Sequence, residues 1–222
     1  MEVFVGIDYL KGQILINNND IVPTCCNTLM SSAYAGSVRY YAAMLKAQNV
    51  DINATETHLD KEWGYHHCNI AGANGVQTLT IPIVKPIKGS LTPLNEIRIS
   101  THGDWERIHW GALFSAYGKS PFFEYIESDL HKLYMNHSNW IIDFNESLHN
   151  LIIDFLDFPI KTERVDVSHI IEKGSDIAPI KDVEYYQLWK SRHGFLSNLS
   201  ILDLLMNTGR ESIFILQKMM QI

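Results

Sequence analysis

The sequence predicts an α/β fold, in which a mixed sheet formed mainly by the N-terminal half packs against a helical C-terminal half. Two observations lead to this prediction. Short β-branched and aromatic runs, separated by Gly and Asn turns, fill residues 3–99. Apolar residues at helical spacing dominate residues 105–219. No repeat and no Pro/Gly/Ser-rich linker divides the chain, so we expect a single domain over residues 1–222.

The first unit is a β-loop-α-β segment. A strand over 29–33 leads to a turn at Gly36, and Ser37 is typical of a helix N-cap before 38–47. Residues 50–54 then alternate apolar and polar, which predicts a second strand. Such units usually contain a parallel strand pair with a right-handed crossover.

Hairpins flank this unit. The β-branched runs within 3–16 predict a short one. The most strand-like stretch is 65–83, where Asn74-Gly75 is a strong turn signal. Residues 97–99 predict another short strand.

The remainder is mainly helical, apart from residues 164–167, which predict an isolated strand. Caps and breakers mark the helix ends. The predicted helices are 105–117 after Asp104, one from Pro121 after Ser120, one from Asn145 as N-cap, 201–206 after Ser200, and 211–219.

Composition excludes several classes of protein. The 18 basic and 25 acidic residues give a net charge of −7, which argues against nucleic acid as a partner. No apolar run approaches the roughly 20 residues of a membrane helix, and the N-terminus does not resemble a secretory signal. Three cysteines cannot form a framework of paired disulfides. We therefore expect a cytoplasmic protein with a small-molecule or sugar-linked substrate and an undefined oligomeric state.

Histidines form the first candidate site. His66 and Cys68 share one face of a predicted strand, and with His102 or His109 they have the residue types of a zinc site. Adjacent histidines are not a usual ligand spacing, so the alternative is a hydrogen-bonded core histidine beside one facing a cleft. We predict no metal and no cofactor.

Two further candidates involve helix starts. The loop around Ser32, between a strand and a helix N-terminus, has the residues of an anion pocket, although Ser37 as an N-cap and Ser32 as part of the strand offer a purely structural explanation. Trp105 and His109 lie four residues apart and share a helical face. His109 is therefore either a general base or a satisfied core histidine.

Four segments taken together resemble a known family. They are 30–34 with the Tyr40-Tyr41 helix, 66–83, 105–123, and 198–205 with Gly209 and Glu211. In order and spacing they look like the WbqC-like family, over about residues 29–220, which leaves 1–28 as an N-terminal extension. The resemblance implies a role in O-antigen or other surface-polysaccharide biosynthesis, with glycine (aminoacyl) transfer to a sugar as the proposed reaction.

The resemblance also supplies the expected site. It implies His109 as the catalytic base, acting on a directly attacking hydroxyl or amine of the sugar. The substrate-binding residues expected with it are Ser32, Tyr34, His66, His67, Asn69 and Trp105.

One departure from the family pattern supports a second hypothesis. His66-His67 stand where the family usually has Asn-Arg, and neutral histidine lacks the bidentate fork of arginine. The alternative function is a non-catalytic binding or assembly protein of a polysaccharide locus.

Overall fold

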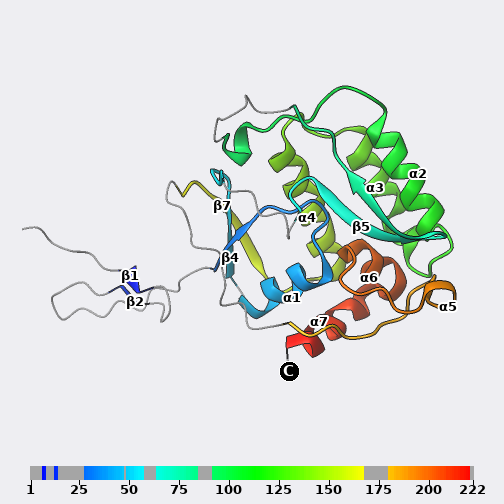
Figure 1. Ribbon diagram of the computed structural model, residues 1–222. Helices are drawn as coiled ribbons and strands as arrows, with labels where there is room; N and C mark the ends of the chain where they lie inside the picture. Colours follow the sequence, from blue (N-terminus) through cyan, green and yellow to red (C-terminus); the bar gives the residue numbers. More distant parts are fainter. Residues whose placement is uncertain are drawn as a thin grey trace, which may run out of the picture.

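A computed structural model describes residues 7–8, 13–14, 28–47, 49–57, 64–84, 92–167 and 180–220 (Figure 1). Its strands are β1 (Ile7–Asp8), β2 (Gln13–Ile14), β3 (Thr28–Ser31), β4 (Asn49–Asn53), β5 (His67–Gly72), β6 (Gly75–Thr80) and β7 (Lys161–Val165). Its α-helices are α1 (Val38–Ala47), α2 (Trp105–Tyr117), α3 (Phe123–Met135), α4 (Ile141–Leu156), α5 (Lys190–His193), α6 (Ile201–Thr208) and α7 (Ser212–Met220). Short 3-10 turns cover Leu94–Glu96 and Gly209–Glu211.

The central sheet is parallel and has the strand order β3-β4-β7. The predicted β-loop-α-β unit is confirmed, because β3 and β4 are parallel neighbours joined through α1. The prediction of an isolated strand at 164–167 is wrong, since β7 pairs with β4 along its length. That pairing joins residues more than 100 positions apart, and a local pattern cannot reveal it.

The predicted hairpin is confirmed. Strands β5 and β6 pair antiparallel from His67↔Thr80 to Gly72↔Gly75, so the chain reverses at Ala73-Asn74. Gly75 has φ +103°, a conformation that favours glycine. In the described N-terminal residues β1 also pairs antiparallel with β2. Residues 97–99 form only isolated bridges, through Ile99 to Ile83 and Arg98 to Trp140.

Some of the predicted helix ends are confirmed and others are wrong. Helix α2 has the predicted bounds, and Ser200 caps α6 by accepting a bond from the Leu202 N–H (3.2 Å). The start predicted at Ser120-Pro121 is wrong: α3 begins at Phe123, and the Ser120 hydroxyl donates to the Tyr117 carbonyl instead of capping it. The cap predicted at Asn145 is also wrong, because α4 starts at Ile141 and encloses that residue.

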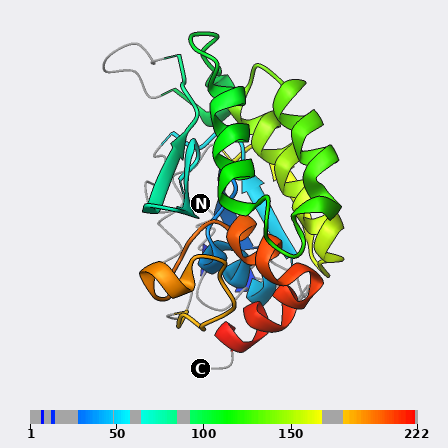
Figure 2. The ribbon, with the colours of Figure 1, turned by 90° about the vertical axis from the view of Figure 1, so that its right-hand side faces the viewer.

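The helices form two groups around the strands. Helices α2, α3 and α4 lie side by side (Figure 2), while α1, α6 and α7 gather at the other end of the molecule (Figure 1). None of the helices in the described part of the chain combines the length and the apolar character needed to cross a membrane.

A buried carboxylate ties the C-terminal segment to this layer. Asp203 on α6 is fully buried and accepts hydrogen bonds from the hydroxyls of Tyr117 (2.9 Å) and Tyr185 (2.7 Å) and from the Gln187 amide (3.1 Å). The Tyr117 hydroxyl in turn accepts from the Ala71 N–H on β5 (3.0 Å). One side chain therefore connects α2, α6, the hairpin and the loop before α5.

Candidate functional site

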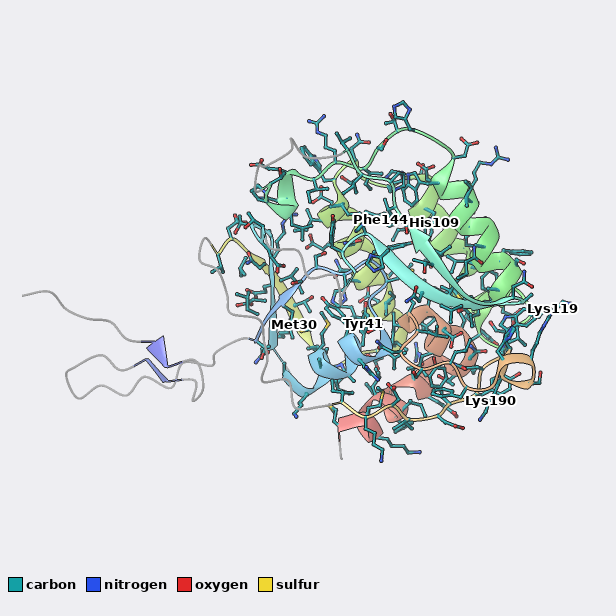
Figure 3. All side chains as sticks on the ribbon, in the orientation of Figure 1. Met30, Tyr41, His109, Lys119, Phe144 and Lys190 are labelled. Carbon is teal, nitrogen blue, oxygen red and sulfur yellow. The ribbon has the colours of Figure 1, made fainter. Side chains whose placement is uncertain are left out.

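Three of the predicted site residues meet in the interior. Tyr34, Trp105 and His109 are at most 4% exposed. The Tyr34 hydroxyl is 2.9 Å from His109 Nδ1 and 2.6 Å from the Tyr134 hydroxyl, and the Trp105 ring packs edge-on against His109. Phe144 on α4 contacts the same cluster, and Figure 3 shows it next to His109. This buried aromatic cluster joins the β3–α1 loop to three helices.

The environment of His109 is that of a satisfied interior histidine. Burial lowers its pKa to about 4, although the Thr80 backbone carbonyl and the Glu106 carboxylate both favour the charged form. The ring is therefore neutral at physiological pH. Its role as a catalytic base stays a prediction, and a substrate would have to pass Tyr34 to reach Nδ1.

The other predicted residues lie on or before the hairpin. His66 and His67 are half-buried, and His66 Nδ1 has no hydrogen-bond partner. Asn69 is exposed, with its amide oxygen accepting from the Thr78 hydroxyl (2.7 Å). Cys68 is buried, and burial raises the pKa of its thiol to about 12. Within the described ranges no group of three or more His, Cys, Asp or Glu side chains could hold a metal ion.

A narrow groove with a cavity volume of about 30 Å³ lies between the parallel sheet and α4. Ser32, the remaining predicted residue, lines it directly after β3 ends. Ligands of parallel α/β sheets usually bind near the carboxyl ends of the strands, and Ser32 and Ile52 bring part of the groove lining to the ends of β3 and β4. We call it the sheet–α4 groove. Its lining residues are Ser32, Ala33, Tyr40, Ile52, Ile142, Asn145, Glu146, His149, Thr162, Glu163 and Arg164.

Asn145, a lining residue of this groove, has a buried polar atom without a partner. The residue is 2% exposed, and its amide nitrogen donates to the Ser32 hydroxyl (3.1 Å) and the Tyr65 carbonyl (2.8 Å). Because a carbonyl can only accept, the nitrogen must face Tyr65. The buried amide oxygen is therefore left without a hydrogen bond. Leaving such a buried atom unpaired costs about 1–3 kcal/mol.

His149, one turn further along α4, has the same property. Its Nδ1 lies 3.1 Å from the Tyr41 hydroxyl, whereas its buried Nε2 has no partner. Burial lowers the pKa of His149 to about 4, so the imidazole is neutral at physiological pH. With the proton on Nδ1 the ring donates to Tyr41, and the Nε2 lone pair is free to accept a proton or a hydrogen bond.

Two glutamates belong to the groove lining, Glu146 on α4 and Glu163 on β7. Because side chains alternate along a strand, the Glu163 carboxylate lies on the sheet face opposite to that of Ile52 and Arg164. The groove's basic lining residue, Arg164, is already paired with Asp143 (2.7 Å) and lies 3.6 Å from Glu146. These two carboxylates neutralise the Arg164 guanidinium before any ligand binds. The Arg164 side chain lies on the same sheet face as those of Ile52 and Met30, its neighbours across the register.

A second, wider hollow, with a cavity volume of about 430 Å³, lies between the hairpin turn and α2. Small side chains and backbone line it, including Gly72, Ala73, Ala112 and Ala116. No buried unpartnered side-chain atom among the described residues belongs to its lining. The sheet–α4 groove is consequently the stronger candidate for a binding site.

Sequence analysis missed both polar groups of the groove. Asn145 was interpreted as a helix cap, and His149 was not singled out. A signal was present, because these two residues are spaced i,i+4 on the face that also carries Ile142. Asn and His side chains on a buried helical face require hydrogen-bond partners, and the chain supplies partners for only some of the polar atoms of Asn145 and His149.

One family model matches the chain. It is described as the WbqC-like protein family and covers residues 32–183, which includes every groove-lining residue. The segment 198–205, counted above as part of the resemblance, lies beyond the matched range. No curated protein and no solved structure matches.

Proposed function

Because the chain belongs to the WbqC-like protein family, we propose that it is a transferase of surface-polysaccharide biosynthesis whose substrate binds in the sheet–α4 groove. The family resemblance supplies the reaction class, aminoacyl transfer to a nucleotide-linked or lipid-linked sugar in the cytoplasm. The observation that carries the site is the pair of buried atoms without partners, Asn145 Oδ1 and His149 Nε2, on residues that line one groove.

The groove's own side chains have distinct tasks in this reaction. Asn145 Oδ1 accepts a hydrogen bond from the acceptor sugar, and the Ser32 hydroxyl, which already accepts from Asn145, donates one. The side chains of Ile52 and Ile142 form an apolar wall for the face of a sugar ring. The acceptor is thereby held in one orientation.

His149 is the group best placed to move the proton. The acceptor's hydroxyl or amine attacks the carbonyl carbon of an activated aminoacyl donor, and a new C–O or C–N bond forms. His149 Nε2 takes the proton of the attacking group and returns it to the leaving group as the old acyl bond breaks. The neutral state of the ring, which follows from its burial, is the state that this step needs.

Transfer assays with the full chain test the proposal. Nucleotide-linked sugars and an aminoacyl donor are incubated with the protein, and mass spectrometry detects the acylated product. We expect His149→Gln to lower turnover by about 10²-fold or more while the melting temperature is retained. His131→Gln, a substitution on α3 outside the groove, is the matched control.

The His109→Gln variant tests which of the two histidines, His109 or His149, acts as the base. Loss of turnover in a folded His109→Gln variant, with His149→Gln fully active, would assign the base to His109 and overturn our assignment. Sugar binding in the groove without transfer for any donor would instead favour the binding or assembly protein. That alternative is consistent with the described part of the groove lining, which includes neither Cys nor Lys.

A further inference from the structure

The outer edge of β6, the second strand of the hairpin, is an interaction surface. We propose that two copies of this chain associate by pairing their β6 strands antiparallel, so that the two hairpins join into one four-stranded sheet. The surface is separate from the sheet–α4 groove, because none of the residues described as lining that groove belongs to β6.

The backbone of β6 has hydrogen-bonding groups that face away from the hairpin. On β5, backbone groups of Asn69 and Ala71 bond to the N-cap of α6 and to α2, so they point away from β6. In an antiparallel pair, the residues directly opposite share this orientation. These residues are Thr78 and Val76, whose N–H and C=O groups therefore point away from β5. Within the part of the chain that the structure describes, these groups have no backbone partner, and no strand besides β5 pairs with β6.

This edge is accessible and unprotected. The hairpin lies beside α2, on the side away from α3 and α4 (Figure 2), and Val76 is 54% exposed. Proteins that keep a sheet edge unpaired usually protect it with a charged side chain, a proline or a bulge. The strand Gly75–Thr80 has none of these, since its sequence is GVQTLT and its pairing with β5 is continuous. Such an edge is a template for another strand.

Charge favours a second copy as the partner. Residues 65–84 contain no Asp, Glu, Lys or Arg, although these residues make up 19% of the whole chain. The chain has a net charge of −7, which makes two copies repel each other. The uncharged hairpin is therefore a surface on which two acidic copies can approach without facing like charges. A charged peptide would find no ion-pair partner on it.

The strand is also complementary to itself. When two β6 strands are antiparallel about Gln77, Val76 lies opposite Thr78 of the second copy, and each such pair exchanges both main-chain hydrogen bonds. Cross-strand pairs of β-branched side chains add to the stability of a sheet. The two Gln77 side chains meet on the other face, in a pair without main-chain bonds, where side chains are closer. An amide has both donors and an acceptor, so two identical amides satisfy each other.

Sedimentation velocity of the full chain at increasing concentration tests the proposal. We expect a monomer–dimer equilibrium for the natural sequence. Thr78→Pro should weaken association by about tenfold or more, because proline removes the outward N–H from both pairs. The N–H of Thr78 does not bond to β5, so the hairpin and the melting temperature should be retained.

Charge variants at Gln77 identify the partner and the register. Gln77→Lys and Gln77→Glu should each be monomeric, because like charges face each other directly across the twofold axis. An equimolar mixture of the two variants should restore the dimer. Gln217→Lys, an exposed substitution on α7, is the matched control and should dimerise like the natural chain.

Three results would overturn the proposal. The first is a natural chain that is still monomeric at about 1 mM, where even weak complexes form. The second is a dimer that persists in Thr78→Pro and in both Gln77 variants, because another surface would then form it. The third is a mixture of the Gln77→Lys and Gln77→Glu variants that stays monomeric, because the two strands would then not meet at Gln77.

Discussion

Removing one hydroxyl from the buried Asp203 network should measurably destabilise the protein. In Tyr185→Phe, Asp203 Oδ2 loses the donor at 2.7 Å and keeps only the Gln187 amide at 3.1 Å. Hydrogen bonds to charged groups contribute about 1.5–3 kcal/mol to stability. For a chain of this size each kcal/mol corresponds to about 2–4 °C, so we expect the melting temperature to fall by roughly 3–12 °C. Thermal and urea unfolding followed by circular dichroism measure the change.

The loss should depend on pH. Burial raises the pKa of Asp203 above its ordinary value of 3.8, while the bonds from Tyr185, Tyr117 and Gln187 lower it. A pKa that is higher in the folded state adds stability that is present below pH 3.8 and is lost as the pH rises through the folded pKa. Tyr185→Phe removes a bond that favours the carboxylate, so the folded pKa rises further. The variant's deficit relative to the natural chain should therefore be larger at about pH 7 than at about pH 4.

Tyr186→Phe is the matched control, because the neighbouring Tyr186 is 56% exposed. It should change the unfolding free energy by no more than about 0.5 kcal/mol. If Tyr185→Phe is as stable as this control, or if its deficit is the same at both pH values, the hydroxyl does not support a charged Asp203 and the reasoning is refuted.

Two further predictions concern the backbone and the thiol. Gly209→Ala should destabilise the fold by at least about 1–2 kcal/mol, because φ is +57° and the added methyl group would lie 2.5 Å from the Phe122 ring. Gly111→Ala, which has open space on α2, should instead stabilise the fold by up to about 1 kcal/mol. Equal melting temperatures for the two variants would contradict this prediction. Burial raises the pKa of the Cys68 thiol to about 12, so Cys68 should resist iodoacetamide at pH 8 in the native protein and react only after unfolding. Peptide mass mapping measures the labelling. Fast labelling of the native protein would contradict the prediction and show that the strand opens.

Much of the fold was predictable because its causes are local. The alternation in β4, the Asn74-Gly75 turn and the apolar stripe of α2 depend on residues a few positions apart, and they correctly predicted a parallel pair, a hairpin and a helix. The helix starts at Ser120 and Asn145 were predicted wrongly because Ser, Pro and Asn suit several positions. The side-chain amide of Asn145 donates hydrogen bonds to Ser32 and Tyr65, which are distant in sequence and which no capping rule considers.

The candidate site depended on long-range contacts. The sequence by itself determined the fold class, the family resemblance and the presence of polar residues such as Ser32 near a strand end. Only the tertiary structure decided that β7 joins the sheet, that His109 and Tyr34 close into the interior, and that Asn145 and His149, which line the groove, each keep a buried unpaired atom. Whether a polar atom has a partner is a property of residues brought together by packing, and spacing along the chain does not contain it.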